Sequence, residues 1–346
     1  MKINRVLIRE DFSELELAVP YRVFSFSEIR NGLFSILERF KINKSSTILY
    51  YENKNKNFLN AFLNRNDKIK EYNNEQVDEV VDSKGFMPWE LISNLSTQIN
   101  LDIEIYLKKV KWINKLKIKP KNFSIIGKSK NLHIHQDANI YPNVVFDVSS
   151  GPIVVDRDVK VTPFSYLEGP LYIGPHSRID NARITGGCII GTSCRIGGEI
   201  ENSILCDYTN KHHEGFLGHS FVGHWVNIGA LATTSDLKNN YGIVKLNINE
   251  KIINTNSIKF GSIIGDFSKI GIGTMLNTGS VLDIGSNIVV SRFSGYSNPF
   301  TWLENKNKYR LDKFISDTKK IMGRRNQNLD PLMEVVLQNI YEEKFE

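Results

Sequence analysis

The sequence has 346 residues, of which 41% are hydrophobic and 24% are charged. This length allows two domains with separate cores, and the composition is that of an ordinary globular protein. The net charge of +6 is spread along the chain, and apolar side chains interrupt its densest basic run at residues 108–121. We interpret this run as a solvated face between two domains, rather than as a nucleic-acid or membrane contact.

Three features of the sequence predict a cytoplasmic location. Residues 1–8 lead directly into a strand-like run without the pattern of a signal peptide. No apolar run approaches the length needed to span a membrane. The three cysteines, Cys188, Cys194 and Cys206, cannot all pair with one another, so we expect small buried thiols in a reducing compartment.

The N-terminal third has the pattern of a mixed α/β region. Short buried strands are expected at residues 6–8 and 47–51. Apolar spacing predicts a helix over residues 26–40 with Ser27 as its cap, and a second helix is expected to begin near Pro88.

This α/β region lacks the usual signature of phosphate binding. A nucleotide-binding domain of the common kind has a glycine-rich loop after its first strand. Here the run Arg9-Glu10-Asp11-Phe12 follows that strand, and the first glycine is Gly32. Carboxylates at this place repel a phosphate, so we predict that the region performs no nucleotidyl transfer.

From about residue 123 aliphatic residues recur at every sixth position. This spacing is typical of a hexapeptide β-helix, in which short strands stack and bury one aliphatic ladder. A helical period does not keep every sixth residue on one face, and long hairpins would need longer strand-like runs. The ladder residues are Val155, Val161, Leu167, Ile173 and Ile179, then Ile190 and Ile196, then Val222 and Ile228, then Ile264, Ile270, Leu276 and Leu282.

Two further expectations follow from this repeat. If three hexapeptides form one coil, Cys188 and Cys206 stack in adjacent coils as interior residues. After residue 300 the repeat stops, and amphipathic helices are expected at residues 309–322 and 331–341. Helices at this place suit a cap that covers the open end of a solenoid.

The segment from Cys206 to Tyr241 is chemically the richest of the chain. It holds His212, His213, His219 and His224. Its run His213-Glu214-Gly215-Phe216-Leu217-Gly218, followed by Val226-Asn227-Ile228-Gly229-Ala230 and Asn240-Tyr241, resembles the acetyltransferase domain of the bifunctional glucosamine-1-phosphate acetyltransferase / N-acetylglucosamine-1-phosphate uridyltransferase family. A subgroup described as sugar nucleotidyltransferases is similar in more places, which are Gly197-Gly198-Glu199-Ile200, Ser203, Asn210-Lys211, residues 237–241, Val244-Lys245-Leu246, Asn277-Thr278-Gly279, residues 28–32 and the C-terminal helices.

The resemblance implies a fold and an assembly. Residues 1–122 would form a degenerate nucleotidyltransferase-like α/β domain with a basic linker, residues 123–300 a left-handed parallel β-helix, and residues 301–346 a C-terminal helical cap. The chain would form a homotrimer, with acetyl-coenzyme A lying between neighbouring prisms as co-substrate. The acceptor would be an amino sugar or a sugar nucleotide used in cell-envelope precursor synthesis.

The resemblance also implies roles for particular residues. His213 would be the general base that takes a proton from the attacking amine, in line with the chemistry that an amine and a thioester require. Asn240 would orient the histidine or the acyl group. Substrate contacts are expected from Asn227, Phe216, Glu201, Tyr241 and Lys211, and coenzyme A contacts from Gly229, Ala230, Lys238 and Lys245. Backbone N–H groups near Gly229 or Ala230 would stabilise the oxyanion.

Two positions depart from the family pattern. Phe216 replaces a tyrosine whose hydroxyl could bind a substrate phosphate, and Glu201 stands where a lysine is expected. The substrate is therefore expected to differ from the family's sugar phosphate.

Two other functions remain open at this stage. His213, His219 and His224 could ligate zinc between subunits, as in the β-helical carbonic anhydrases that this architecture also resembles. The positions of His219 and His224 beside hexapeptide corners favour surface exposure, so we predict no metal site. A trimeric scaffold without catalysis is the third hypothesis.

Overall fold

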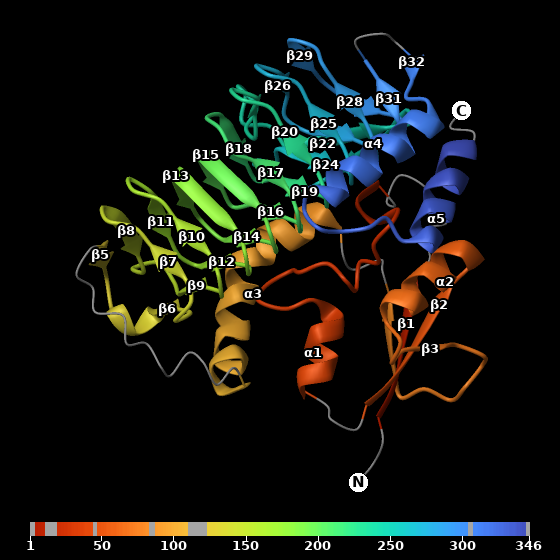
Figure 1. Ribbon diagram of the computed structural model, residues 1–346, viewed down its shortest axis with the longest axis horizontal. Helices are drawn as coiled ribbons and strands as arrows, with labels where there is room; N and C mark the ends of the chain where they lie inside the picture. The colour runs from red at the N-terminus through yellow and green to blue at the C-terminus, as the bar shows by residue number, and fades with distance from the viewer. Residues whose placement is uncertain are drawn as a thin grey trace.

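The computed structural model describes residues 4–10, 19–43, 47–82, 87–109, 123–303 and 307–343. A small α/β region and a long parallel β-helix lie side by side, with two C-terminal helices next to both (Figure 1). In the described ranges no helix has the length and apolar character needed to cross a membrane. Most of the basic run at residues 108–121 lies outside the described residues.

The α/β region contains a four-stranded parallel sheet in the order β3-β2-β1-β4. Both strands expected from the sequence are confirmed as parts of β1 and β2. The helix that begins at Pro88 is also confirmed. The elements of this region are β1 (Asn4–Glu10), a 3-10 turn at Val19–Tyr21, α1 (Ile36–Asn43), β2 (Thr47–Asn53), α2 (Lys56–Arg65), β3 (Lys70–Glu71), β4 (Glu79–Asp82) and α3 (Pro88–Lys109).

The predicted start of the helix expected over residues 26–40 is wrong. α1 begins only at Ile36, because Ser35 and Glu38 form a capping box there. The Ser35 N–H donates to Glu38 Oε2 at 2.8 Å, and the Glu38 N–H donates to Ser35 Oγ at 3.2 Å. The residues before it form an irregular segment whose apolar side chains are buried in the core, including Ile29 and Leu33. Apolar spacing alone therefore did not distinguish a helix from a buried loop.

The second part of the chain is a left-handed parallel β-helix with three faces. Face 1 consists of β6 (Leu132–Ile134), β9 (Ile153–Val155), β12 (Leu171–Ile173), β14 (Cys188–Ile190), β16 (Ile204–Leu205), β19 (Phe221–Val222), β24 (Ser262–Ile264), β27 (Ser280–Leu282) and β30 (Tyr296–Ser297). Face 2 consists of β7 (Asn139–Ile140), β10 (Lys160–Val161), β17 (Asn210–Lys211), β20 (Asn227–Ile228), β25 (Lys269–Ile270), β28 (Asn287–Ile288), β31 (Thr301–Trp302) and β32 (Asn307–Lys308). Face 3 consists of β5 (Phe123–Ile126), β8 (Val144–Asp147), β11 (Tyr166–Glu168), β18 (Phe216–Gly218), β21 (Thr233–Thr234), β26 (Met275–Leu276) and β29 (Arg292–Phe293). The long strands β13 (Arg178–Thr185) and β15 (Arg195–Glu201) pair with strands of both face 2 and face 3, and a 3-10 turn at Ser129–Asn131 precedes β6.

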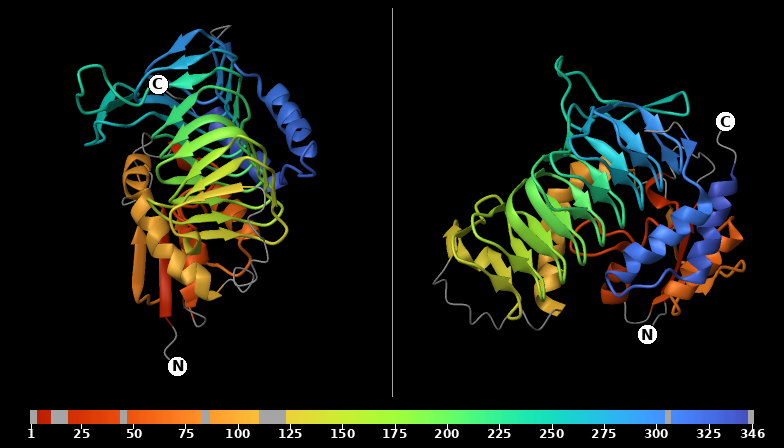
Figure 2. Two further views of the ribbon diagram at one scale, coloured as in Figure 1. Left: turned by 90° about the vertical axis from the view of Figure 1, so that its left-hand side faces the viewer. Right: turned by 45° about the horizontal axis from the view of Figure 1, so that its top comes forward.

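The aliphatic ladder expected from the six-residue period is confirmed. Every ladder residue named above is buried in the interior of the prism. The alternate residues of face 1 are also apolar, but they point outward and share a second core with the α/β region. Face 1 is thus covered by the rest of the chain, with α3 lying along it (Figure 2).

The coils differ in length, and this corrects the expected stacking of the cysteines. Ile189 pairs with Ile204 on the next coil, so this coil has only 15 residues. Cys188 therefore stacks on Ser203, whose N–H lies 3.5 Å from its sulfur, and not on Cys206. All three cysteines are buried and free, as expected. The reducing compartment stays a prediction.

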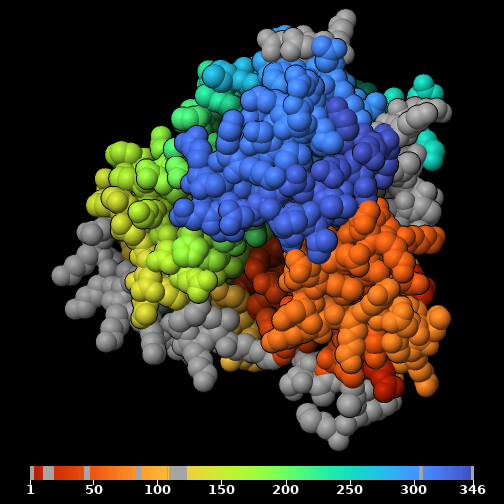
Figure 3. All heavy atoms as spheres, turned by 45° about the vertical axis from the view of Figure 1, so that its right-hand side comes forward, coloured from red at the N-terminus to blue at the C-terminus, as the bar shows by residue number. Residues whose placement is uncertain are grey.

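Both C-terminal helices are confirmed, as α4 (Leu311–Gly323) and α5 (Pro331–Glu342). They lie along the side of the last coils, where Phe314 of α4 packs on Phe267 and Phe300. α5 packs against α2 of the α/β region, and Figure 3 shows α5 and the α/β region meeting on one side of the molecule. The division into three domains stays a proposal.

A buried ion pair adds to this junction. Arg22 donates to both carboxylate oxygens of Asp283, at 2.6 and 2.7 Å, and both side chains are almost fully buried. Because the pair joins residues far apart in the sequence, it fixes the α/β region against face 1.

Candidate functional site

His213 lies at the edge between face 2 and face 3, directly after β17. Its side chain is exposed, and its ring centroid lies 5.1 Å from that of His212. The exposed position suits a side chain that exchanges a proton with a bound substrate.

Lys211 fixes the backbone beneath His213. Its position in the ladder lies between Ile196 and Ile228, so its side chain points into the prism and is fully buried. The ammonium donates to the carbonyl of His213 at 2.8 Å and to that of Gly197 at 2.9 Å. Burial lowers the pKa of Lys211 to about 8. The sequence-based role of Lys211 as a substrate contact is corrected, because its ammonium faces the interior.

His212, the neighbour of His213, is paired with a carboxylate. Its Nε2 lies 2.6 Å from Asp180 Oδ2, although the two residues are separated by a whole coil. The coil between them carries Gly197 at the matching position, and a Cβ there would lie 2.1 Å from the His212 carbonyl oxygen. Burial raises the pKa of Asp180, but hydrogen bonds from Arg178 and His212 outweigh it and lower the pKa. Sequence reasoning missed this pair.

The other two histidines of the segment are held by carboxylates. His219 Nδ1 lies 2.7 Å from Asp236 Oδ2. His224 Nδ1 lies 3.1 Å from Asp266 Oδ1, and its ring packs on Phe24 of the α/β region at 3.9 Å. The expected surface exposure of His224 is wrong, since the α/β region covers it.

The contact with Asp266 shifts the pKa of His224, and the positions of the histidines bear on a zinc site. Burial lowers the pKa of His224, yet the hydrogen bond that Asp266 accepts and its negative charge outweigh burial, and the pKa is raised. No cluster of three or more metal-binding side chains occurs in the described part of the chain.

The residues around Asn240 lie on a segment inserted between β21 and β24. This segment contains the hairpin of β22 (Lys245–Ile248) and β23 (Lys251–Asn254) and projects from the prism (Figure 2). Asn240 accepts a hydrogen bond from the Gly242 N–H at 3.0 Å, and Tyr241 is exposed. Lys238 donates to the Ile243 carbonyl at 2.9 Å.

The structure does not bring His213 and Asn240 together within one chain. His213 lies at the edge between faces 2 and 3, whereas the inserted segment leaves from the edge between faces 3 and 1. Within the described ranges no hydrogen bond or ring contact joins the two residues.

The expected substrate and coenzyme contacts are distributed over faces 2 and 3 and the inserted segment, which carries Lys238, Tyr241 and Lys245. Asn227 is exposed on face 2 and accepts a hydrogen bond from Asn210 at 2.5 Å. The Gly229 N–H donates to Ile270 at 2.9 Å, so it is already used by the coil. The Ala230 N–H has no acceptor among the described residues, and of the two it is the one that can still donate to an oxyanion.

The two departures from the family pattern have structural counterparts. Glu201 forms an ion pair with Lys259 of the inserted segment, at 3.0 Å, so a lysine reaches this place from elsewhere in the sequence. The Phe216 ring folds over Gly218, where a Cβ would lie 2.4 Å from Phe216 Cζ. Each replacement is thus accommodated locally.

Several polar residues that sequence reasoning did not assign line a groove on face 2 beneath α4. The groove holds about 480 Å³. Its lining consists of Arg195, Tyr208, Asn210, His212, Trp225, Val226, Asn227, Lys269, Ile321, Arg324 and Arg325. The register of the coils brings the face 2 residues together, and the pair Arg324-Arg325 after α4 is the one sequence signal that could have pointed to the groove.

Comparisons with known proteins agree with the motif. Bifunctional protein GlmU of Thermotoga sp. (strain RQ2) is 25% identical over 297 residues, which cover 76% of this chain and 60% of that protein. The uncharacterized acetyltransferase YaiX of Escherichia coli O6:K15:H31 (strain 536 / UPEC) is 27% identical over 215 residues, which cover 60% of this chain and 91% of that protein. This chain resembles hexapeptide-repeat acyltransferases of the GlmU type. It spans 60% of the length of the GlmU proteins of Thermotoga sp. (strain RQ2) and Thermotoga maritima, and no family model matches it.

Solved structures with hexapeptide repeats are also similar, at low scores. A hexapeptide transferase family protein from Anaplasma phagocytophilum matches with a TM-score of 0.22 and 13% identity, covering 63% of this chain and 93% of that chain. PerB from Caulobacter crescentus, solved with CoA and GDP-perosamine, matches with a TM-score of 0.18 and 12% identity, covering 86% of this chain and 96% of that chain. Scores this low carry no argument about function.

Proposed function

We propose that this protein transfers an acetyl group from acetyl-coenzyme A to the amine of an amino sugar or a sugar nucleotide. The observation that carries the proposal is the exposed His213, held at the prism edge by the buried ammonium of Lys211. The names of the relatives, GlmU and an acetyltransferase, support the same reaction class. The inserted segment with Asn240 and Tyr241 completes the motif.

The reaction is a transfer from a thioester to an amine. His213 takes a proton from the amine as the nitrogen attacks the thioester carbonyl carbon. The oxyanion that forms accepts a hydrogen bond from the N–H of Ala230. When the carbon–sulfur bond breaks, the coenzyme A thiolate receives the proton from His213, so that the amide and a free thiol are the products.

We also propose a homotrimer in which the inserted segment of one copy reaches His213 of its neighbour. The separation of His213 and Asn240 onto different edges supports this, because the two side chains, both among the described residues, make no hydrogen bond to each other within one chain. Large apolar side chains are exposed along the edge that carries His213, notably Phe164 at 72%, Leu231 at 63% and Ile272 at 79%. Exposed apolar patches of this kind mark protein interfaces.

A thiol-release assay tests the proposed activity. Purified protein with acetyl-coenzyme A and a panel of amino sugars and sugar nucleotides should release free thiol, and His213→Ala should lower kcat by at least about 100-fold. His176→Ala is the matched control, since His176 is a half-exposed histidine beside Asp158 at a different edge. No thiol release with any acceptor, or equal rates in His213→Ala and wild type, would refute the proposal.

Mixing two inactive variants tests the shared site. His213→Ala and Asn240→Ala each lack one residue, so a mixed trimer regains some sites that hold both. Activity should therefore reappear after the two proteins are unfolded and refolded together. Mixed trimers without activity would contradict a site shared between copies.

We further propose that the α/β region has no nucleotidyltransferase activity. The acidic residue Glu10, at the end of β1, is buried and accepts hydrogen bonds from the Phe26 N–H and from Tyr51. Its carboxyl group is thus part of the core. Pyrophosphate release from a nucleoside triphosphate and a sugar phosphate would overturn this statement.

A further inference from the structure

The groove beneath α4 on face 2 is cationic. Four of its lining side chains carry a positive charge, namely Arg195, Lys269, Arg324 and Arg325, and no carboxylate is among the lining residues. Burial lowers the pKa of Arg325, and the nearby charges of Arg195 and Arg324 lower it further. Like charges at such close range are unfavourable without an anion between them.

The coil register builds the floor of the groove. Arg195, Asn210, Asn227 and Lys269 lie at matching positions of four successive coils and point outward from face 2. The floor thus has a cation at each end and two amides between them. The amides can both donate and accept hydrogen bonds.

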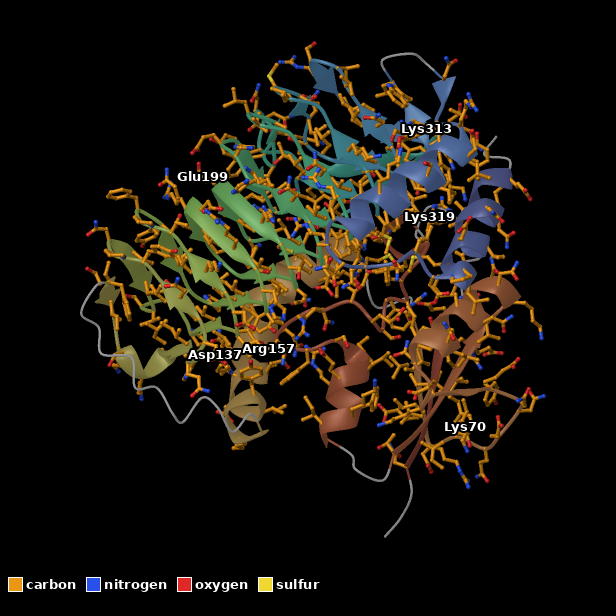
Figure 4. All side chains as sticks on the ribbon, in the orientation of Figure 1. Lys70, Asp137, Arg157, Glu199, Lys313 and Lys319 are labelled. Carbon is orange, nitrogen blue, oxygen red and sulfur yellow. The ribbon has the colours of Figure 1, made fainter. Side chains whose placement is uncertain are left out.

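α4 and the residues after it build the opposite wall. Ile321, Arg324 and Arg325 face the groove, and Arg325 is anchored by a hydrogen bond to the Ser193 carbonyl at 3.2 Å. Lys319 of the same helix pairs instead with Glu334 of α5 at 2.7 Å. Figure 4 labels Lys313 and Lys319 and shows where α4 crosses the coils.

An aromatic stack forms one side of the groove. The rings of Tyr208 and Trp225 lie 4.0 Å apart and 3° from parallel. Both residues occupy neighbouring corners between face 1 and face 2, with positive φ values of 62° and 59°. The other end of the groove reaches His212, the neighbour of His213.

We propose that this groove binds the diphosphate of a nucleotide-containing ligand, with Arg195, Arg324, Arg325 and Lys269 as its phosphate contacts. Arginine forks and ammonium groups are the side chains that recognise phosphate oxygens. The ligand class includes both coenzyme A and sugar nucleotides. This inference deepens the proposed function and rests on it for the identity of the ligand. A diphosphate in the groove directs the remainder of the ligand past His212 toward His213.

Calorimetric titration with inorganic pyrophosphate tests the groove without any turnover. Arg195→Gln and Arg324→Gln should each raise Kd about tenfold or more, because each removes a charge-assisted contact. Both side chains are exposed, so the variants are expected to fold, and their melting curves check this. Arg183→Gln is the matched control, since Arg183 is an exposed arginine that pairs with Glu199 on face 3. It should leave Kd unchanged.

Competition for pyrophosphate identifies the source of the diphosphate. Displacement by coenzyme A but not by UDP or GDP assigns the groove to the acetyl donor, and the reverse result assigns it to the acceptor. The proposal is overturned if pyrophosphate does not bind, if Arg183→Gln weakens it as much as Arg324→Gln, or if no nucleotide competes, which would indicate an adventitious ion only. Pyrophosphate binding with no thiol release would refute the proposed function and leave the groove intact. If the arginine variants release thiol at the normal rate and bind pyrophosphate with unchanged Kd, the proposed role of the groove is refuted and the proposed function is not.

Discussion

Replacing Lys211 by methionine tests two consequences of the buried ammonium. Its charge should lower the stability of the fold, and its hydrogen bond should hold the backbone of His213 in place. Lys211 occupies a ladder position between Ile196 and Ile228, where an apolar side chain is expected to pack well. The variant removes the buried charge but leaves the carbonyls of Gly197 and His213 without their donor. At neutral pH the loss of the buried charge stabilises the variant and the loss of the hydrogen bonds destabilises it. The informative quantity is therefore how the difference in free energy of unfolding between wild type and variant changes with pH.

The magnitude follows from the pKa of Lys211. Burial lowers it from 10.5 to about 8, and each unit corresponds to about 1.4 kcal/mol. Between these two pH values the unfolded chain holds a proton on Lys211 that the folded chain has released. The free energy of unfolding of the wild type therefore rises by about 3 kcal/mol across the window, relative to the variant. Below pH 8 the difference between the two proteins should be constant.

Urea unfolding from below pH 8 to above pH 10.5 measures this difference, and equal m-values would show that the two transitions are comparable. Lys160→Met is the control, because Lys160 is an exposed lysine on face 2 and should show no such change. The variant at position 211 should also lose acetyl transfer, since the His213 backbone loses its support. A stability difference that stays constant across the window would refute the reasoning.

Three other changes test separate parts of the structure. Gly197→Ala places a Cβ 2.1 Å from the His212 carbonyl oxygen, so the free energy of unfolding in urea should fall by about 1–3 kcal/mol. Arg22→Met leaves the Asp283 carboxylate buried without its cation, and melting curves should show a loss of about 3–5 kcal/mol, part of which the additional change Asp283→Asn should restore. Burial raises the pKa of Glu10 from 4.5 to about 7, so the folded state holds its proton more tightly and stability should fall by about 3 kcal/mol as pH rises through that window. Glu10→Gln should abolish that part of the pH dependence.

Each of these three predictions has a result that would contradict it. Wild-type stability in Gly197→Ala would show that the coil shifts without strain. A single Arg22→Met variant as stable as the double variant would show that the lone carboxylate is not penalised. An unchanged pH profile in Glu10→Gln would assign the titration to another group.

The sequence predicted the β-helix well because its period reflects a local and repeated contact. Each ladder residue packs on the residue at the same position of the next coil, so every coil carries the signal. Coil length was not visible in the same way. The coil that contains Cys188 and Cys194 has 15 residues rather than 18, and the strand pairing reveals it, for example that of Ile189 with Ile204.

The site was predictable only in part. A linear motif identified the segment around His213, because the residues concerned are close in the sequence. The pairing of His212 with Asp180 spans 32 positions and depends on a glycine in the coil between. The groove depends on α4, which follows the strands that line it by more than forty residues, and on a register that the period alone does not give.

The junction between α2 and α5 has a consequence for how the protein folds during synthesis. The core of the α/β region includes side chains of α5, among them Val336, Leu337 and Ile340. Its N-terminal strands are made first, but they cannot complete this core until residues 331–342 have left the ribosome. The β-helix can meanwhile extend coil by coil from local contacts. The early α/β segment must therefore remain exposed to chaperones and proteases for most of translation, and its final burial is a late, long-range step.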